Sequence, residues 1–176
     1  MTETKSSLLV NIFAMEVMVI KKLRLYLETS VCNYYFDENR EGHEDTIRLF
    51  EAIGAGDFEA YTSEYVTLEL KRAYEPKRGN MINLLEKYNV TVLDYNEDAE
   101  RLAFLYVNNN IIPARFWLDC AHIAIATVHK LDCVISYNFE HINRTKTKIL
   151  VGEVNFQEKY RNVTICTSKE VLDYEI

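Results

Sequence analysis

The chain has 176 residues and 48% of them are apolar, which suits a single folded domain with its own hydrophobic core. A formal net charge of −7 at pH 7 excludes loose binding to polyphosphates by bulk attraction, so any contact with a nucleic acid must be local. The four cysteines lack zinc-finger spacing, which excludes a metal finger and predicts buried free thiols in a reducing compartment.

The first 20 residues precede the domain proper. Residues 8–20 are apolar, but Asn11 and Glu16 interrupt them, and the stretch is too short to span a bilayer. It has neither the basic start nor the cleavage-type ending of a signal peptide. We therefore expect a cytoplasmic protein without membrane association. Residues 1–21 are predicted to be an N-terminal extension, either a disordered arm or an interface contact, and residues 22–176 one domain.

Short apolar runs alternate with helical patterns along this domain. The strand candidates are residues 23–27, 58–62, 90–93, 133–136 and 163–166. Helical patterns mark residues 47–53, 64–74, 96–106 and 118–130, with Asn96 as an expected N-cap. This alternation predicts an α/β fold with a parallel sheet of four to five strands, covered by helices on both faces. Sites in such sheets lie at the carboxyl ends of the strands.

Glu69 lies on the apolar side of its predicted helix, 64–74. At 100° per residue it is about 60° from Val66 and about 40° from Ala73, which both belong to the apolar stripe. A buried carboxylate without a partner costs several kcal/mol, so it pairs with a cation or holds a metal ion. An ion pair with Lys or Arg from another helix is the alternative explanation for Glu69.

Further oxygen-bearing side chains stand where buried elements begin or end. Glu28 follows the first strand directly, and Asp119 opens the apolar helix 118–130, where favourable interaction with the helix dipole is an alternative role. Ser136 and Asn138 follow the strand that begins at Cys133, although Asn is also common in turns. Three carboxylates and an amide at strand ends suit Mg²⁺ or Mn²⁺.

His122, one turn after Asp119, is interpreted as a hydrogen-bonded core histidine rather than a ligand or base, because an oxygen-rich site does not need it. The sequence contains no elbow signature of a serine hydrolase, no phosphate-binding glycine loop and no dinucleotide fingerprint. These residues point to a small metal-dependent nuclease.

Four segments carry a resemblance to a known family. They are LYLETSV at residues 25–31, TSEYVTLEL at 62–70, DCAHIAIA at 119–126 and SYNFEH at 136–141. In this order and spacing they resemble the PIN domain, a small α/β nuclease fold found in toxins of toxin–antitoxin pairs and in RNA-processing nucleases. The resemblance implies a PIN-like three-layer α/β/α fold. It also implies a shallow acidic pocket for one or two divalent ions.

The resemblance assigns roles to individual residues. Glu28, Glu69 and Asp119 correspond to the family's first three acids, and Asn138 stands at or near the fourth. Thr29 or Ser30 would support the first acid by hydrogen bonding, and Ser136 is a further supporting residue. Family members usually carry Asp at the position of Glu28, and one methylene moves the carboxylate by about 1.5 Å. We expect metal binding and activity to be reduced by Glu28 and by Asn138.

The predicted function is a divalent-metal-dependent endoribonuclease, the toxin of a toxin–antitoxin pair, acting on RNA with Mg²⁺ or Mn²⁺ and forming a homodimer. A small antitoxin protein is an expected partner. Candidates for holding the RNA backbone are Arg115, His141, Arg144 and Lys146. Two alternatives stay open: a catalytically weakened PIN-like protein that binds or dimerises, and a Mg²⁺-dependent phosphohydrolase acting on a small phosphate ester.

Overall fold

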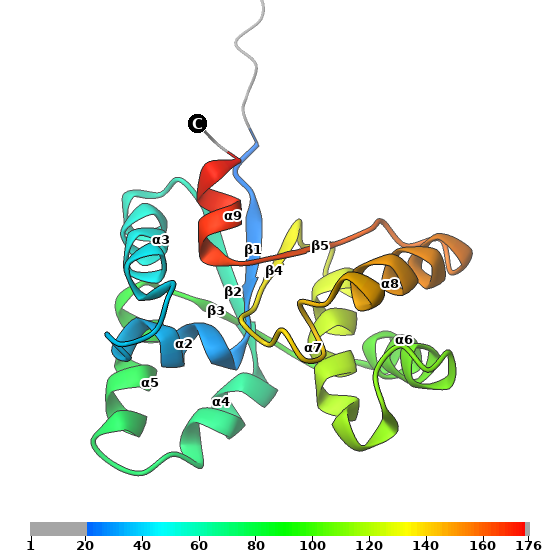
Figure 1. Ribbon diagram of the computed structural model, residues 1–176, viewed down its shortest axis with the longest axis horizontal. Helices are drawn as coiled ribbons and strands as arrows, with labels where there is room; N and C mark the ends of the chain where they lie inside the picture. Colours follow the sequence, from blue (N-terminus) through cyan, green and yellow to red (C-terminus); the bar gives the residue numbers. More distant parts are fainter. Residues whose placement is uncertain (1–20, 175–176) are drawn as a thin grey trace, which may run out of the picture.

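The computed structural model describes residues 21–174, so all but the last residue of the predicted N-terminal extension lies outside the described part. A five-stranded parallel sheet of order β3-β2-β1-β4-β5 forms the centre (Figure 1). Its strands are β1 (Arg24–Leu27), β2 (Glu59–Ser63), β3 (Thr91–Leu93), β4 (Cys133–Ile135) and β5 (Thr164–Cys166). All five predicted strands are confirmed.

Helices cover both faces of this sheet, which confirms the three-layer α/β/α architecture. In Figure 1, α2, α3 and α5 lie on one side of the sheet and α6, α7 and α8 on the other. The helices are α2 (Thr29–Phe36), α3 (His43–Ala55), α4 (Glu64–Lys71), α5 (Lys77–Lys87), α6 (Glu97–Asn108), α7 (Trp117–Val128), α8 (Thr145–Gln157) and α9 (Ser168–Asp173), with a short 3₁₀ turn, η1 (Ala114–Phe116), before α7.

The strand order places a crevice beside β1. The chain leaves β1 for β2 and β3 on one side and later returns to add β4 and β5 on the other. The order therefore reverses between β1 and β4, and ligands of parallel sheets bind outside the carboxyl ends of the strands at such a point. Glu28 follows β1 and Ser136 follows β4, so both residues stand at this crevice.

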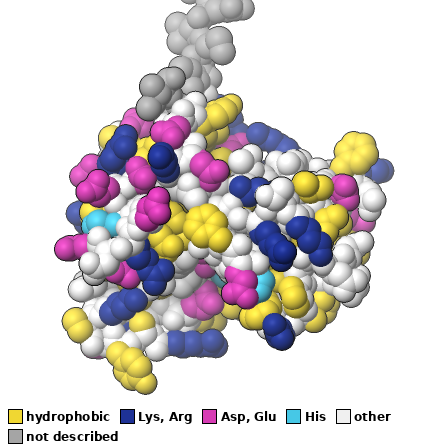
Figure 2. Space-filling model, in the orientation of Figure 1, with side chains coloured by type: hydrophobic (Ala, Val, Ile, Leu, Met, Phe, Trp, Pro, Cys, Tyr) yellow, Lys and Arg dark blue, Asp and Glu magenta, His cyan; other side chains and the backbone are white. Residues whose placement is uncertain are grey.

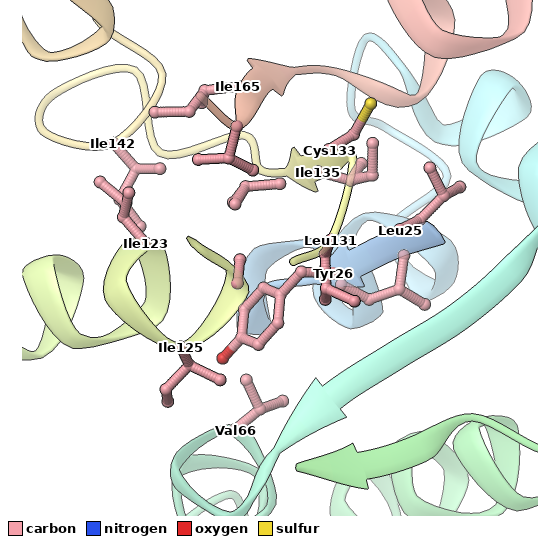
Figure 3. Packing of buried hydrophobic residues seen from close by; sticks show 14 of the residues in the cluster. Leu25, Tyr26, Val66, Ile123, Ile125, Leu131, Cys133, Ile135, Ile142 and Ile165 are labelled. Atoms are coloured by element: carbon pink, nitrogen blue, oxygen red, sulfur yellow. The ribbon is translucent and has the colours of Figure 1, made fainter. Parts of the chain in front are cut away.

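The core contains two central strands, β1 and β4, that are buried on both faces. Leu25, Tyr26 and Leu27 of β1 are fully buried, as expected for a central parallel strand covered by two helical layers. Figure 3 shows the Tyr26 side chain reaching across the core, with its hydroxyl oxygen directed between Ile125 of α7 and Val66 of α4. A polar atom at that depth needs a hydrogen-bond partner, and the partners of Tyr26 lead to the site described below.

Helix α4 ends at Lys71, earlier than the predicted end at residue 74. The backbone N–H groups of Arg72 and Ala73 bond to the carbonyls of Glu69 and Leu70, which tightens the last turn. Pro76 disfavours a helical conformation at the residue before it, and the helix stops upstream. Asn96 caps α6 as predicted, because its Oδ1 accepts a 3.0 Å bond from the N–H of Ala99.

The four cysteines are all buried and free, as predicted. Within residues 21–174, no helix combines the length and the apolar character needed to cross a membrane.

Candidate metal centre and active site

Glu28 is fixed at the crevice by both strands that flank it. It follows β1 and is the N-cap of α2, and its own N–H donates to the carbonyl of Ile135 at the end of β4 (3.1 Å). Its side chain is only 6% exposed, yet its Oε2 accepts hydrogen bonds from the hydroxyls of Ser30 (2.5 Å) and Ser136 (2.9 Å). These two bonds stabilise the buried carboxylate and set its direction.

The hydroxyl of Ser30 also connects the start of α2 to the segment after β4, since it accepts a 2.9 Å bond from the N–H of Tyr137. Of the two neighbouring hydroxyls expected to support the first acid, only Ser30 contacts Glu28. Thr29 instead donates to Oε2 of Glu69, so it links the first helix to the second acid. Ser136, the other predicted supporting residue, donates to Oε2 of Glu28 as described above.

Glu69 lies on α4 with a partly buried side chain, as its place on the apolar side of the helix predicts. Burial acts to raise its pKa, but the hydrogen bonds from His122 and Thr29 outweigh that effect, and the pKa of Glu69 is lowered. Within residues 21–174 the partner of Glu69 is the imidazole of His122 on α7, whose Nε2 lies 3.4 Å from Oε2, rather than the Lys or Arg of the alternative explanation.

His122 joins this site to the core. Its ring is 1% exposed, and its Nδ1 lies 2.7 Å from the hydroxyl of Tyr26, which lies 2.7 Å from the Oγ of Ser63 at the end of β2. The sequence interpretation of a hydrogen-bonded core histidine is correct for Nδ1. It missed the other nitrogen, which faces Glu69. The available signal was that His122 lies only about 60° from Asp119 around the helix.

Glu28, Glu69 and His122 form a compact cluster of possible metal ligands. One donor atom from each of them lies within 4.8 Å of the others. Ligands at right angles on a Mg²⁺ ion are about 3 Å apart, and opposite ligands about 4.2 Å, for ion–ligand distances of about 2.1 Å. The spacing therefore fits one divalent ion after small side-chain adjustments.

Asp119 lies in the first turn of α7, beside this cluster but outside it. Its Oδ2 is 2.9 Å from the Nδ1 of His141, whose ring packs on Phe116 at 3.9 Å between centroids. Burial raises the pKa of Asp119, the charges of His122 and His141 counteract the rise, and the charge of Glu28 adds to it. The pKa of Asp119 therefore depends on the neighbouring charges of the site, and its carboxylate is also held by His141.

Asn138 closes the turn that follows β4. Its Oδ1 accepts a 3.0 Å bond from the N–H of His141, and its own N–H donates to the Oγ of Ser136 at 3.0 Å. The amide oxygen of Asn138 is therefore occupied by a hydrogen bond within the turn. Asn138 thereby positions Ser136, which in turn holds Glu28.

The four candidate RNA-binding residues make different contacts. His141 contacts Asp119, and the guanidinium of Arg115 lies over the ring of Phe116, 4.7 Å from its centroid. Lys146 donates to the carbonyl of Asn110, and Arg144 is the N-cap of α8. Arg115 and His141 therefore share the Phe116 ring at the edge of the site. Figure 2 shows acidic and basic side chains intermixed on the face it presents.

The fold and the site together define a class: an α/β/α domain that gathers carboxylates at the carboxyl ends of a parallel sheet, where its strand order reverses. The chain belongs to the PIN domain family, whose model matches residues 25–147.

Two solved structures have a similar fold. VapC20 of Mycobacterium tuberculosis, a toxin that cleaves the sarcin–ricin loop, has 15% sequence identity and a TM-score of 0.51, over 66% of this chain and 92% of that one. VapBC2 of Rickettsia felis, bound to a DNA fragment from its promoter, has 12% identity and a TM-score of 0.49, over 81% of this chain and 97% of that one. A search of the curated proteins found no match.

Proposed function

We propose that this protein is a divalent-metal-dependent endoribonuclease and the toxin of a toxin–antitoxin pair. The observation that carries the proposal is the convergence of Glu28, Glu69 and His122 in a PIN fold, with Asp119 alongside. The fold neighbour VapC20 is a toxin that cleaves an RNA loop, which supports RNA as the substrate class.

In the proposed site, Glu28, Glu69 and Asp119 would hold Mg²⁺ or Mn²⁺. When bound, such an ion supplies Lewis acidity and lowers the pKa of a water molecule. The chain's own residues determine how the carboxylates meet it. Ser30 and Ser136 orient Glu28, and Thr29 orients Glu69.

The RNA backbone would lie along the edge formed by η1 and the loop after β4. Arg115 stands at that edge over Phe116, and His141 lies against the same ring. Arg144 and Lys146 at the start of α8 add positive charge beyond it. Such contacts position a strand without reading its sequence.

The proposed partners are a small antitoxin, a second copy of this chain and RNA in the cytoplasm. Support for a homodimer comes from an apolar pocket lined by Tyr65, Tyr95, Phe104 and Trp117, where Phe104 is 60% exposed and Trp117 45%. Exposed aromatic side chains of this kind favour association.

A weakened PIN protein that only binds or dimerises is the second candidate, and the use of Asn138 in a turn favours it. Such a protein should show no saturable Mn²⁺ site in a calorimetric titration. Hydrolysis of a chromogenic phosphate ester in place of RNA would instead favour the small-ester phosphohydrolase.

The test is cleavage of mixed RNA by purified protein with Mn²⁺, with Mg²⁺ and with EDTA. Cleavage should require the metal, and Glu69→Gln and Asp119→Asn should each reduce it by at least a hundredfold, since each removes a carboxylate from the site. Asp98→Asn is the matched control, because Asp98 is an exposed acid in the first turn of α6 and shares only the helix-dipole role with Asp119. If either site variant cuts RNA at the parental rate, the assigned site is wrong.

A further inference from the structure

His122 is a buried imidazole in the wall of the acidic site. Its two nitrogens face different partners: Nδ1 lies 2.7 Å from the hydroxyl of Tyr26, and Nε2 lies 3.4 Å from Oε2 of Glu69. The Nε2 atom is therefore the one that faces Glu69.

We propose that Nε2 of His122 binds the divalent ion directly, together with Glu28 and Glu69, so that the metal centre contains a nitrogen donor. This inference rests on the proposed function of the same site. It adds a nitrogen donor to the carboxylates of that site, where Asp119 is also held by His141.

The spacing of the donor atoms supports a shared ion. The Nε2 of His122 and the Oε2 of Glu69 are separated by 3.4 Å, close to the distance of about 3 Å between neighbouring ligands of one small ion. Glu28 completes the group within the same 4.8 Å limit. Glu28 and His122 are almost fully buried, so an ion between them would lose much of its water shell and depend on these side chains.

The hydrogen bonds of Tyr26 allow His122 to change which of its ring nitrogens carries the proton. Without an ion, the Oγ of Ser63 can donate to Tyr26, Tyr26 to Nδ1, and Nε2–H to Glu69. The hydroxyls of Ser63 and Tyr26 can both rotate, which reverses the direction of their hydrogen bonds. The imidazole can then adopt its other neutral tautomer, in which the ring carries its single proton on Nδ1 and none on Nε2. The ring then donates Nδ1–H to Tyr26 and presents the lone pair of Nε2 to the ion. A histidine that binds a metal usually donates the N–H of its other ring nitrogen to a polar acceptor.

A nitrogen ligand has a consequence for the choice of metal. Carboxylates suit Mg²⁺ and Mn²⁺ alike, whereas imidazole favours transition metals over Mg²⁺. We therefore expect the intact protein to prefer Mn²⁺ over Mg²⁺, and we expect His122→Gln to weaken Mn²⁺ binding at least tenfold while changing Mg²⁺ binding much less.

The direct test is pulsed electron paramagnetic resonance of Mn²⁺ bound to the full chain. The spectrum should show ¹⁴N modulation from an imidazole ligand, and ¹⁵N labelling of histidine should replace it. The chain has four histidines, so variants assign the signal. It should vanish in His122→Gln and persist in His141→Gln and in His129→Gln, the last being a control at the end of the same helix.

Each outcome decides the proposal. Mn²⁺ binding without ¹⁴N modulation, or modulation that vanishes only in His141→Gln, overturns it and leaves the proposed nuclease function standing. Absence of any Mn²⁺ binding in the parental protein overturns both. If circular dichroism shows that His122→Gln is unfolded, the parental, His141→Gln and His129→Gln spectra still decide, because a signal from His122 must survive in all three.

Discussion

Glu28 shows how one residue's surroundings determine its chemistry. Its carboxylate receives hydroxyls from two separate segments, Ser30 on α2 and Ser136 after β4. An Asp on the same backbone would withdraw the carboxylate by about 1.5 Å, away from both donors. The sequence favours a site weakened by the longer side chain. The two hydrogen bonds favour a site adapted to it.

We therefore predict that Glu28→Asp weakens Mn²⁺ binding about tenfold, equivalent to about 1.4 kcal/mol, because the shorter side chain leaves Ser136 without its acceptor. Calorimetric titration of the folded variant measures this. Glu86→Asp, an exposed change on α5, should bind Mn²⁺ as the parent does. Tighter binding by Glu28→Asp would show instead that the longer side chain had cost the site its geometry.

Residues of the candidate site differ in how far the sequence predicts them. Glu28, Glu69 and Asp119 could be found because each interrupts an apolar pattern, and a local pattern is visible in one dimension. The sequence places His122 near Asp119 on α7, but its contact with Glu69 joins two helices that are far apart in the sequence, and a local pattern does not show such a contact. The turn formed by Asn138 is equally invisible, because Asn serves turns and metal sites alike.

Among the helices, periodic patterns located only those with a clear apolar face. Helix α8 illustrates the failure: Val151 and Val154 are buried, but Ile149 and Phe156 on the same helix are exposed, so no apolar stripe stands out. The helices α2, α5 and α9 were likewise not located from the sequence. The strands were located because each is a short apolar run bounded by polar residues, whichever helices cover it.

Two buried hydrogen bonds of the Tyr106 hydroxyl join three helices on one side of the sheet. The hydroxyl of Tyr106 on α6 donates to Oδ1 of Asn155 on α8 at 2.5 Å, and it lies 3.4 Å from Oγ1 of Thr127 on α7. Both Tyr106 and Asn155 are fully buried. These bonds therefore fix how α6 and α8 pack around α7.

We predict that Tyr106→Phe lowers the free energy of unfolding by about 1–3 kcal/mol, because Asn155 keeps a buried oxygen without its donor. The melting temperature should fall by several degrees in a thermal unfolding experiment. Tyr74→Phe is the matched control, since Tyr74 is 92% exposed and should change nothing. Equal melting temperatures for the two variants would show that this bond contributes no net stability.

For the whole molecule, the net charge of −7 disfavours capture of RNA by bulk attraction, and the face shown in Figure 2 carries acidic and basic side chains intermixed. Binding would depend on local contacts beside the acidic site. A toxin of this kind should act on few RNA targets rather than on bulk RNA, because each contact must fit a particular backbone shape.

We predict that expression of this chain alone slows bacterial growth, that Glu69→Gln removes the effect by disabling the site, and that a co-expressed small neighbouring protein rescues the parent. Growth curves with matched expression levels measure this. Asp98→Asn should slow growth as the parent does. Harmless expression of parental protein that is shown to be folded would refute the role as a toxin.

Because the chain returns to the middle of the sheet only at β4, the parts of the candidate site are synthesised at different times. Glu28 and Glu69 emerge early from a ribosome, but the carbonyl of Ile135 that fixes Glu28, and the hydroxyl of Ser136 that orients it, come much later in the chain. A nascent chain carrying β1, β2 and β3 therefore has two of its acids but no fixed site. The proposed site would form only once β4 has been synthesised and pairs with β1.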